Sequence, residues 1–307
     1  MSRFAPTACR VCGETLDFAR QGSGFEHEPS AFRPTSHPPG EHGDLYRCGT
    51  CGTIQQPSLP QGADLRALYR DVSDPDYLGE ERGRRHTARW LLDLLGRYVP
   101  RGRLLEVGCG YGLLLDEARR RGYETEGLEL SREAVAHARE TLGLSVEDVA
   151  FEDAALEGRR YDAVLLVDVL EHFDDPVRAL TRASDLLAPR GVLLVVTPDP
   201  SSLTARLAGG RWWAYLPSHF CLIPRDTLRG LIHARRLALV EDVLSRHSFT
   251  PGYWLAGLAE RSSWAAGAIA RLAGKLPRTV LFTASLGDER VMLARRVEAG
   301  GSEQPSA

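Results

Sequence analysis

Long apolar runs, cysteine and lysine are scarce in this sequence, and the first two scarcities each exclude a class of protein. No stretch reaches the ~18 uncharged apolar residues of a membrane-spanning helix, because the nearest, residues 254–274, is interrupted by Glu260, Arg261 and Arg271. Six cysteines in 307 residues are too few for a disulfide-rich secreted scaffold. Lys275 is the only lysine, a bias that points to a GC-rich genome more than to a function.

A large excess of charge of either sign is also lacking. The 38 basic and 41 acidic residues leave a net charge of −3. No overall positive charge would therefore hold the phosphates of a nucleic acid, and only a local basic patch could do so. The amino terminus has no apolar signal core. We therefore expect a cytoplasmic protein without a transmembrane segment, whose partner is a small molecule in preference to a nucleic acid.

Short apolar runs alternate with helical stretches from residue 103 onward. This alternation predicts an α/β fold, with a parallel sheet covered by helices on both faces. Gly122 ends one expected helix, and Ser131 is the expected N-cap of the next. The expected strands cover residues 104–107, 124–130, 144–149, 162–167, 192–197, 238–243 and 291–294, and the expected helical stretches cover residues 64–98, 113–121, 132–142, 176–187 and 227–235.

A glycine-rich turn follows the first of these strands, at residues 106–112 (Glu-Val-Gly-Cys-Gly-Tyr-Gly). Glycine lets the chain turn sharply and lets a ligand approach the backbone, and the helix behind it offers free N–H groups. Glu129 stands at the end of the next strand, where a carboxylate can accept both hydroxyls of a ribose. A dinucleotide turn is the alternative, but its Gly-x-Gly-x-x-Gly fingerprint places the third glycine one residue later than here.

This turn resembles the first motif of class I S-adenosylmethionine-dependent methyltransferases, and the likeness continues over about residues 75–245. The resemblance implies a doubly wound, Rossmann-like seven-stranded sheet that binds S-adenosylmethionine at the carboxyl ends of its strands. The segments that carry it are residues 104–112, 127–131 (Gly-Leu-Glu-Leu-Ser), 161–164 (Tyr-Asp-Ala-Val), 168–176 (Asp-Val-Leu-Glu-His-Phe-Asp-Asp-Pro) and 191–198 (Gly-Val-Leu-Leu-Val-Val-Thr-Pro).

The resemblance also implies roles for the matching residues. Glu106 and the glycine turn would hold the methionine part of the cofactor, and Glu129 would bind its ribose. Asp168 and Val169, at the tip of the fourth strand, would face the sulfonium and the acceptor, so Asp168 is also a candidate catalytic residue. The expected cofactor-binding residues are Glu106, Gly108, Cys109, Gly110, Gly112, Glu129, Leu130, Phe151, Asp168 and Val169.

The adenine end departs from the family pattern. An acidic residue often follows the third strand in such enzymes, whereas this chain has residues 149–151 (Val-Ala-Phe) there. Phe151 is the candidate for stacking on the adenine, and Asp148 or Glu152 is the candidate polar partner. Cys109 and Cys221 are interpreted as small buried residues.

The segment after the fifth strand resembles a subgroup that includes ubiquinone and sugar methyltransferases. In that subgroup a proline is followed by a loop, a Trp, a His and a helix, which here are Pro198, residues 212–213, His219 and residues 227–235. His219 is the candidate general base, because imidazole titrates near neutrality and an acceptor hydroxyl must lose its proton as the methyl arrives. A structural histidine that hydrogen-bonds the loop is the alternative.

Two Cys-x-x-Cys pairs near the amino terminus predict a metal site. Cys9 with Cys12, and Cys48 with Cys51, can each hold a metal from one tight knuckle, and four thiolates close a tetrahedral, structural zinc site. The gap of thirty-five residues between the pairs is longer than the usual ~15–20. Two disulfides or free thiols are the alternative. The histidines in the gap that could replace a cysteine ligand are His27, His37 and His42.

Several aromatic and basic residues support two interpretations each. Tyr69, Tyr77, Arg82 and Arg85 form either a lid over the methionine carboxylate or a solvated helix face. His172 is assigned a structural or substrate-lining role. Six further aromatics indicate either an apolar acceptor pocket or packing beneath a lid. They are Trp212, Trp213, Tyr215, Phe249, Tyr253 and Trp254.

The predicted organisation is a zinc-binding module over residues 1–60, a helical lid or linker over 61–100, and a methyltransferase domain over 101–299. Residues 249–286 are interpreted as a substrate-side insertion that could instead touch a membrane or a second subunit, and residues 300–307 as a disordered tail. The expected reaction is methylation of a sugar or secondary metabolite, on oxygen in preference to carbon or nitrogen. An RNA or protein methyltransferase that docks through the zinc module and a non-catalytic scaffold are the rival hypotheses.

Overall fold

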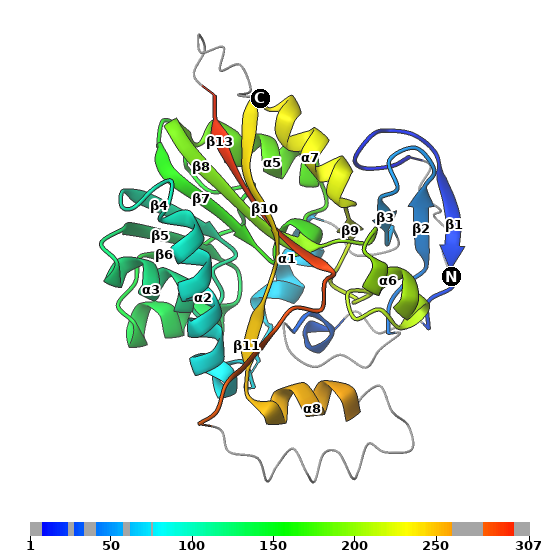
Figure 1. Cartoon of the computed structure of the whole chain (residues 1–307), viewed down its shortest axis with the longest axis horizontal. Helices are drawn as coiled ribbons and strands as arrows, with labels where there is room; N and C mark the ends of the chain where they lie inside the picture. The colour runs from blue at the N-terminus through cyan, green and yellow to red at the C-terminus, as the bar shows by residue number, and fades with distance from the viewer. Residues whose placement is uncertain are drawn as a thin grey trace, which may run out of the picture.

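A seven-stranded sheet forms the centre of the molecule, in the order β10-β13-β8-β7-β4-β5-β6, and a smaller sheet lies beside it (Figure 1). The computed structural model describes residues 8–23, 28–33, 41–57, 62–74, 76–259 and 279–297. The strands of the large sheet are β4 (Arg103–Val107), β5 (Glu124–Glu129), β6 (Val146–Asp148), β7 (Tyr161–Val167), β8 (Leu187–Pro198), β10 (Leu237–Leu244) and β13 (Glu289–Arg296).

Helices cover both faces of this sheet, because its central strands are apolar on both sides. Leu104 and Leu105 are neighbours on β4 and are both fully buried, yet they belong to different cores. Leu104 packs in a core with α2, α3 and α4, and Leu105 in a core with α5 and α7. These helices are α2 (Glu81–Leu95), α3 (Leu113–Arg120), α4 (Arg132–Ala136), α5 (Pro176–Asp185) and α7 (Arg225–Ala234). The predicted α/β, doubly wound class is therefore confirmed.

The large sheet is mixed, whereas the sequence predicts a parallel one. Strand β13 lies between β8 and β10 and runs antiparallel to both. The apolar pattern of β13 could not reveal this, because a buried strand reads the same in either direction. The chain builds β4, β5 and β6 outward and then returns to place β7 on the other side of β4. Such a reversal leaves a crevice at the carboxyl ends of β4 and β7.

The small sheet joins the amino-terminal segment to the second half of the chain. Its strands are antiparallel in the order β1-β2-β3-β9, and β3 pairs with β9 through Ile54 with Leu222 and Gln55 with Cys221. The weak periodicity of this segment predicts loops. The structure forms strands instead, and these are too short to show an alternating pattern. Residues on the two sides of the predicted boundary at residue 60 thus share one sheet. The strands are β1 (Leu16–Arg20), β2 (Leu45–Cys48), β3 (Ile54–Gln55) and β9 (Cys221–Leu222).

The remaining elements lie outside the two larger sheets. Strands β11 and β12 pair with each other, and β11 contacts α2. Residues 260–278 of the expected insertion and the expected tail at 300–307 lie outside the described residues. Across the part of the chain that the structure describes, no helix combines the length and apolarity needed to span a bilayer. The elements are η1 (Pro29–Phe32), α1 (Gly62–Arg70), η2 (Tyr77–Glu80), η3 (His137–Thr141), η4 (Leu170–His172), α6 (Leu203–Ala208), η5 (Gly209–Arg211), β11 (His247–Phe249), α8 (Pro251–Ala259) and β12 (Phe282–Ala284).

Candidate active site

A cavity of about 1100 Å³ opens at the carboxyl edge of the large sheet. Its walls come from the ends of β4, β5 and β7, from the segment that precedes α2, and from β11 and β12. Single-ligand pockets measure ~300–1000 Å³, so this cavity has room for a nucleoside-sized cofactor and a second molecule. All of the expected cofactor-binding residues line it except Gly112.

The glycine turn adopts the left-handed backbone that only glycine takes without strain. Gly108, Gly110 and Gly112 have φ angles of 66°, 51° and 80°. A Cβ at Gly108 would lie 2.8 Å from Val169, and one at Gly112 would lie 2.7 Å from Leu144. Gly112 therefore serves the packing at the start of α3 rather than the cavity wall, while Gly108 brings the turn against the end of β7.

Glu129 ties the end of β5 to the glycine turn. Its carboxylate accepts the backbone N–H of Gly110 at 2.8 Å and those of Leu130 and Ser131 at 2.7 and 2.8 Å. Burial raises the pKa of Glu129, although these three N–H donors act to lower it. The carboxylate is thus held rigidly at the cavity wall, with acceptor capacity left for a ligand hydroxyl.

Glu106 carries a buried oxygen that the protein leaves unpaired. The side chain is 4% exposed, and among the described residues its Oε2 has no hydrogen-bond partner. Burial raises the pKa of Glu106, and the nearby Glu129 carboxylate raises it further. A buried unpaired carboxyl oxygen costs stability unless a ligand supplies a donor. The positively charged amino group of a methionine moiety would be such a donor, so these residues fit the expected cofactor.

A stack of side chains covers the glycine turn from the segment before α2. The ring of Tyr77 stacks on that of Tyr111, with 4.8 Å between centroids, and the Arg84 guanidinium lies 3.7 Å from the Tyr77 centroid. Tyr77 and Arg84 both line the cavity. The lid hypothesis had named Arg82 and Arg85 and missed Arg84, because helical spacing alone could not show which arginine faces the cavity.

Arg85 instead forms part of a buried network of ion pairs. Its guanidinium contacts Asp116 at 2.7 Å, Glu117 at 3.2 Å and Glu81 at 2.7 Å. Arg82 is exposed and hydrogen-bonds the carbonyl of Thr279. Neither arginine lines the cavity, so the interpretation of these two as a cofactor lid is wrong.

The end of the cavity beyond β6 holds the expected adenine partner. Phe151 is 3% exposed, lines the cavity, and packs against Phe173 with 6.0 Å between ring centroids. Of the two candidate polar partners, Glu152 lines the cavity and Asp148 does not. The opposite end, near Asp168, has a different chemistry.

Asp168 stands at the tip of β7 with a left-handed backbone, at φ 51°. Burial raises its pKa, and the nearby carboxylates of Glu289 and Glu171 raise it further. Burial likewise raises the pKa of Glu171 to about 8. Asp168 therefore lies in an acidic, desolvated part of the cavity, a placement that is frequent at functional sites.

Two histidines meet beside Glu171. The Nδ1 of His219 lies 2.8 Å from the Ala214 carbonyl, and the Nδ1 of His172 lies 2.9 Å from the Ser218 carbonyl. A carbonyl can only accept, so His219 Nδ1 donates to Ala214, while His172 Nδ1 also lies 2.9 Å from the Tyr69 hydroxyl. Glu171, His172 and His219 bring ligand atoms within 4.8 Å of one another, a spacing that could hold a metal ion.

His247 and Glu289 also lie at the cavity wall, and sequence reasoning missed both. His247 lies on β11, and Glu289 is the first residue of β13, next to Pro198 at the end of β8. Only the pairing of β13 with β8 brings Glu289 to the carboxyl edge. The one available signal was its position at the start of the last strand. Expected aromatics of this region that line the cavity are Trp213, Phe249, Tyr253 and Trp254, whereas Trp212 and Tyr215 pack beside it.

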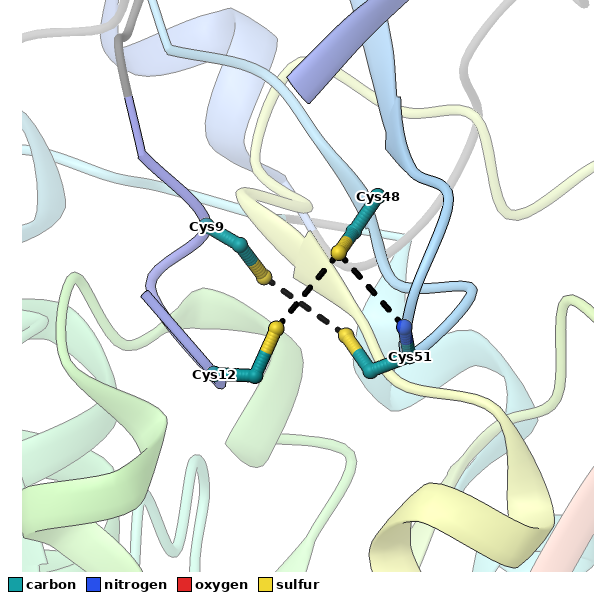
Figure 2. Close-up of side chains that lie close together, drawn as sticks. All are labelled: Cys9, Cys12, Cys48 and Cys51. Carbon is teal, nitrogen blue, oxygen red and sulfur yellow. Dashed lines mark hydrogen bonds between the residues drawn. The ribbon is translucent and has the colours of Figure 1, made fainter. Parts of the chain in front are cut away.

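The four cysteines of the amino-terminal pairs converge, although they come from two separate segments (Figure 2). Sγ atoms are 3.6 Å apart for Cys9 and Cys51 and 3.5 Å apart for Cys12 and Cys48, and all four lie within 4.8 Å of one another. A tetrahedral zinc with Zn–S bonds of ~2.3 Å requires S···S distances of ~3.8 Å. A disulfide requires ~2.05 Å. The arrangement therefore fits a zinc ion.

Hydrogen-bond donors surround these sulfurs. Cys9 Sγ accepts from the side-chain amide of Gln55 at 3.1 Å, and Cys48 Sγ accepts from the Cys51 N–H at 3.5 Å. Burial would raise the pKa of Cys48, but hydrogen bonds from Cys51 and Cys12 outweigh it and lower the pKa to about 7, whereas burial raises the pKa of Cys9 and of Cys12. Thiolate is the form that binds metal.

The histidines in the gap do not join this group as far as the structure describes them. His42 is buried, with Nδ1 2.7 Å from the Gly43 carbonyl and its ring against Tyr215. His27 and His37 lie outside the described residues.

The doubly wound sheet, its glycine turn and the acidic residues at its carboxyl edge define a Rossmann-like protein with a nucleoside-cofactor site. Comparison with known proteins is consistent with this class. The methyltransferase-domain family matches residues 79–242, more than half of the chain. The chain therefore belongs to that family and is a class I S-adenosylmethionine-dependent methyltransferase.

Curated relatives agree with this family, and a solved structure shares the fold. A ubiquinone biosynthesis O-methyltransferase from Cereibacter sphaeroides is 32% identical over 173 residues, which are 52% of this chain and 68% of that protein. A second, from Alkalilimnicola ehrlichii, is 34% identical over 119 residues, which are 36% of this chain and 48% of that protein. A Bacillus halodurans structure assigned as a methyltransferase has a TM-score of 0.50 at 14% identity, and covers 68% of this chain and 98% of its own.

Proposed function

We propose that this methyltransferase acts on a hydroxyl group of a small acceptor, a sugar or a secondary metabolite. The observation that carries the proposal is the lining of one part of the cavity, the acceptor half, which contains the His219 imidazole, the acidic group around Asp168 and several aromatic side chains. The apolar lining favours a secondary metabolite with an apolar body over an unmodified sugar. The relatives named as ubiquinone O-methyltransferases support transfer to oxygen.

In the cofactor half, Glu106 and Glu129 would anchor the amino group and the ribose, with Gly108 and Gly110 allowing close approach. Arg84, stacked on Tyr77, would face the methionine carboxylate. S-adenosylmethionine supplies an activated methyl group when it is bound. Once both partners are held in line, the protein's main tasks are alignment and exclusion of water. The aromatic side chains around the acceptor half serve the second task.

In the acceptor half, His219 would remove the hydroxyl proton. Its Nδ1 donates to the Ala214 carbonyl, which fixes the plane of the ring. A general base needs a ring that the protein orients in this way, and His219 lines the cavity. Asp168 would stand beside the reacting groups at the tip of β7.

The amino-terminal cysteines would hold one structural zinc ion. The S···S distances and the N–H···S contacts support this assignment. Four thiolates leave no open coordination position, so such an ion would not take part in the reaction. It would stabilise a segment that has few buried apolar residues of its own.

The test uses S-adenosylmethionine labelled in its methyl group. The protein is incubated with an extract of its host, and the labelled products are separated by size, with Glu129→Ala as the control that should bind the cofactor poorly. Label in the small-molecule fraction, absent with the variant, supports the proposal and yields the product for identification. Label in RNA or protein overturns the acceptor class. No label, together with no binding of S-adenosylhomocysteine, overturns catalysis itself.

A further inference from the structure

Two consecutive glutamines connect the cysteine group to the loop that carries His219. Gln55 and Gln56 are each only 1% exposed. Neighbouring residues of an extended chain point their side chains to opposite sides. One amide therefore faces the sulfurs and the other faces the loop at residues 214–220.

Gln55 is bonded to the first cysteine knuckle at both ends of its amide. Its Nε2 donates to Cys9 Sγ at 3.1 Å, and its Oε1 accepts the backbone N–H of Arg10 at 3.2 Å. The same residue pairs with Cys221 in the small sheet. Groups in this position orient metal ligands and are themselves oriented by them.

Gln56 is bonded to the His219 loop. Its Nε2 donates to the carbonyls of Leu216 and His219, each at 2.6 Å, and its backbone N–H donates to the Phe220 carbonyl at 3.0 Å. Its Oε1 accepts the Gly43 N–H at 2.7 Å. The reversed amide would place an oxygen against two carbonyl oxygens, so the contacts fix its orientation.

The loop is held from its other side by residues that follow β7. The Phe220 N–H donates to the Glu171 carbonyl at 2.8 Å, and His172 Nδ1 donates to the Ser218 carbonyl at 2.9 Å. Gln56 and residues 171–172 thus clamp the short loop between them. Ser218 and His219 are 2% and 5% exposed, so water cannot readily replace a lost partner.

We infer that Gln56 is a positioning residue, through which the metal-bound cysteine group fixes the loop that presents His219 to the acceptor. The inference rests on the proposed role of His219 and extends it. An amide buried to this degree costs stability unless its donors are paired, and both of its donors are used on this one loop. The zinc site would then affect methyl transfer without touching the reactants.

The direct readout is the rate at which diethyl pyrocarbonate modifies His219, followed by peptide mass spectrometry. Trypsin yields residues 212–225 with His219 as their only histidine, and residues 161–178 with His172 as theirs. Gln56→Met keeps the length of the side chain but has no donors, and Cys12→Ser removes one metal ligand. Thr227→Val is the matched control, because Thr227 joins α7 to the Cys51 carbonyl at 2.7 Å without contacting the loop.

We expect the His219 modification rate to change by about tenfold in Gln56→Met and in Cys12→Ser, since two buried hydrogen bonds are lost or loosened. Thr227→Val should stay close to the wild type. Zinc content should be retained in Gln56→Met and lost in Cys12→Ser, and both should bind S-adenosylhomocysteine with unchanged Kd. With the acceptor fraction of the host extract, kcat should fall by about tenfold while the KM for the cofactor stays constant.

Unchanged His219 reactivity in Gln56→Met and Cys12→Ser would overturn the inference. So would an equal change in Thr227→Val, because it would indicate general loosening of the segment. Where Gln56→Met proves unstable, Gln56→Asn gives the same test, since its shorter amide cannot reach both carbonyls. Absence of methyl transfer by the wild type would refute the proposed function alone, because the His219 modification rates need no acceptor.

Discussion

His247 and Glu289 form an ion pair at the cavity wall, with the imidazole Nε2 2.5 Å from Oε2 of the carboxylate. The Glu289 side chain is 5% exposed and that of His247 is 26% exposed. Burial alone would lower the pKa of His247, but the adjacent carboxylate outweighs it and raises the pKa above its usual range. The same contact lowers the pKa of Glu289.

The first prediction concerns pH. Because the folded-state pKa of His247 is raised, its pairing stabilises the fold fully at acidic pH and is lost as pH rises through that pKa. Glu289→Gln should lower the pKa of His247, measured from the pH dependence of its imidazole NMR signal. With burial acting on His247 without the carboxylate, its pKa falls below the usual value, so the loss of unfolding free energy with rising pH should disappear in the variant. An unshifted imidazole titration would show that the carboxylate does not control His247.

Glu129→Ala tests the cofactor site. The variant loses the carboxylate proposed to bind the ribose, which also accepts the Gly110 N–H. Hydrogen bonds to charged groups contribute ~1.5–3 kcal/mol, so binding of S-adenosylhomocysteine should weaken about tenfold or more by calorimetry. Glu126→Ala is the control, because Glu126 lies on the same strand but pairs with Arg103 and Arg159 away from the cavity. Equal affinity in Glu129→Ala would remove Glu129 from the ribose site.

His219→Ala tests the general base. Loss of a positioned base slows proton transfer, so turnover should fall by ~10²–10⁴-fold. Binding of S-adenosylhomocysteine should be retained, because His219 is not among the cofactor-holding residues. His233→Ala, at an exposed position on α7, should keep full activity. A fully active His219→Ala enzyme would leave His219 with a structural role only.

Zinc content is the fourth measurement. The purified protein should contain one zinc per chain by atomic emission, and Cys48→Ser should lose it and unfold at lower temperature. Cys221→Ala should retain zinc, since Cys221 lies on β9 outside the four-sulfur group. A metal-free protein with unchanged thermal stability would refute the four-cysteine site.

Arg85→Met tests the buried ion network between α2 and α3. The variant leaves Asp116 and Glu117, 1% and 5% exposed, without one of their partners, although other arginines still pair with both. The free energy of unfolding should therefore fall by less than the ~3–5 kcal/mol typical of a buried charge left without a partner, which chemical denaturation can measure. Arg82→Met, at an exposed position on the same helix, should change stability little. Weakened cofactor binding at normal stability would restore the lid hypothesis for Arg85.

The cofactor half of the site could be predicted from the sequence because its determinants are local. The turn at residues 106–112 is contiguous, Glu129 ends β5, and Asp168 follows the buried strand β7. Parallel strands bring their carboxyl ends to one edge, so the order of the motifs along the chain was enough to place these residues together. The two Cys-x-x-Cys pairs could be recognised in the sequence for the same reason, because the two cysteines of each pair are close together along the chain.

The acceptor half was decided by the tertiary structure. His219, His247 and Glu289 come from separate segments and line one cavity. Glu289 reaches it through the pairing of β13 with β8, and His247 lies on β11, which pairs with β12. Likewise, only the pairing of β3 with β9 brings the cysteine group beside the His219 loop. Strand pairing joins backbone groups that are distant in sequence and leaves almost no mark on the residue pattern of two- or three-residue strands. The order of the motifs along the sequence therefore places the residues that would hold the cofactor. Long-range strand pairing places the side chains that would face the acceptor.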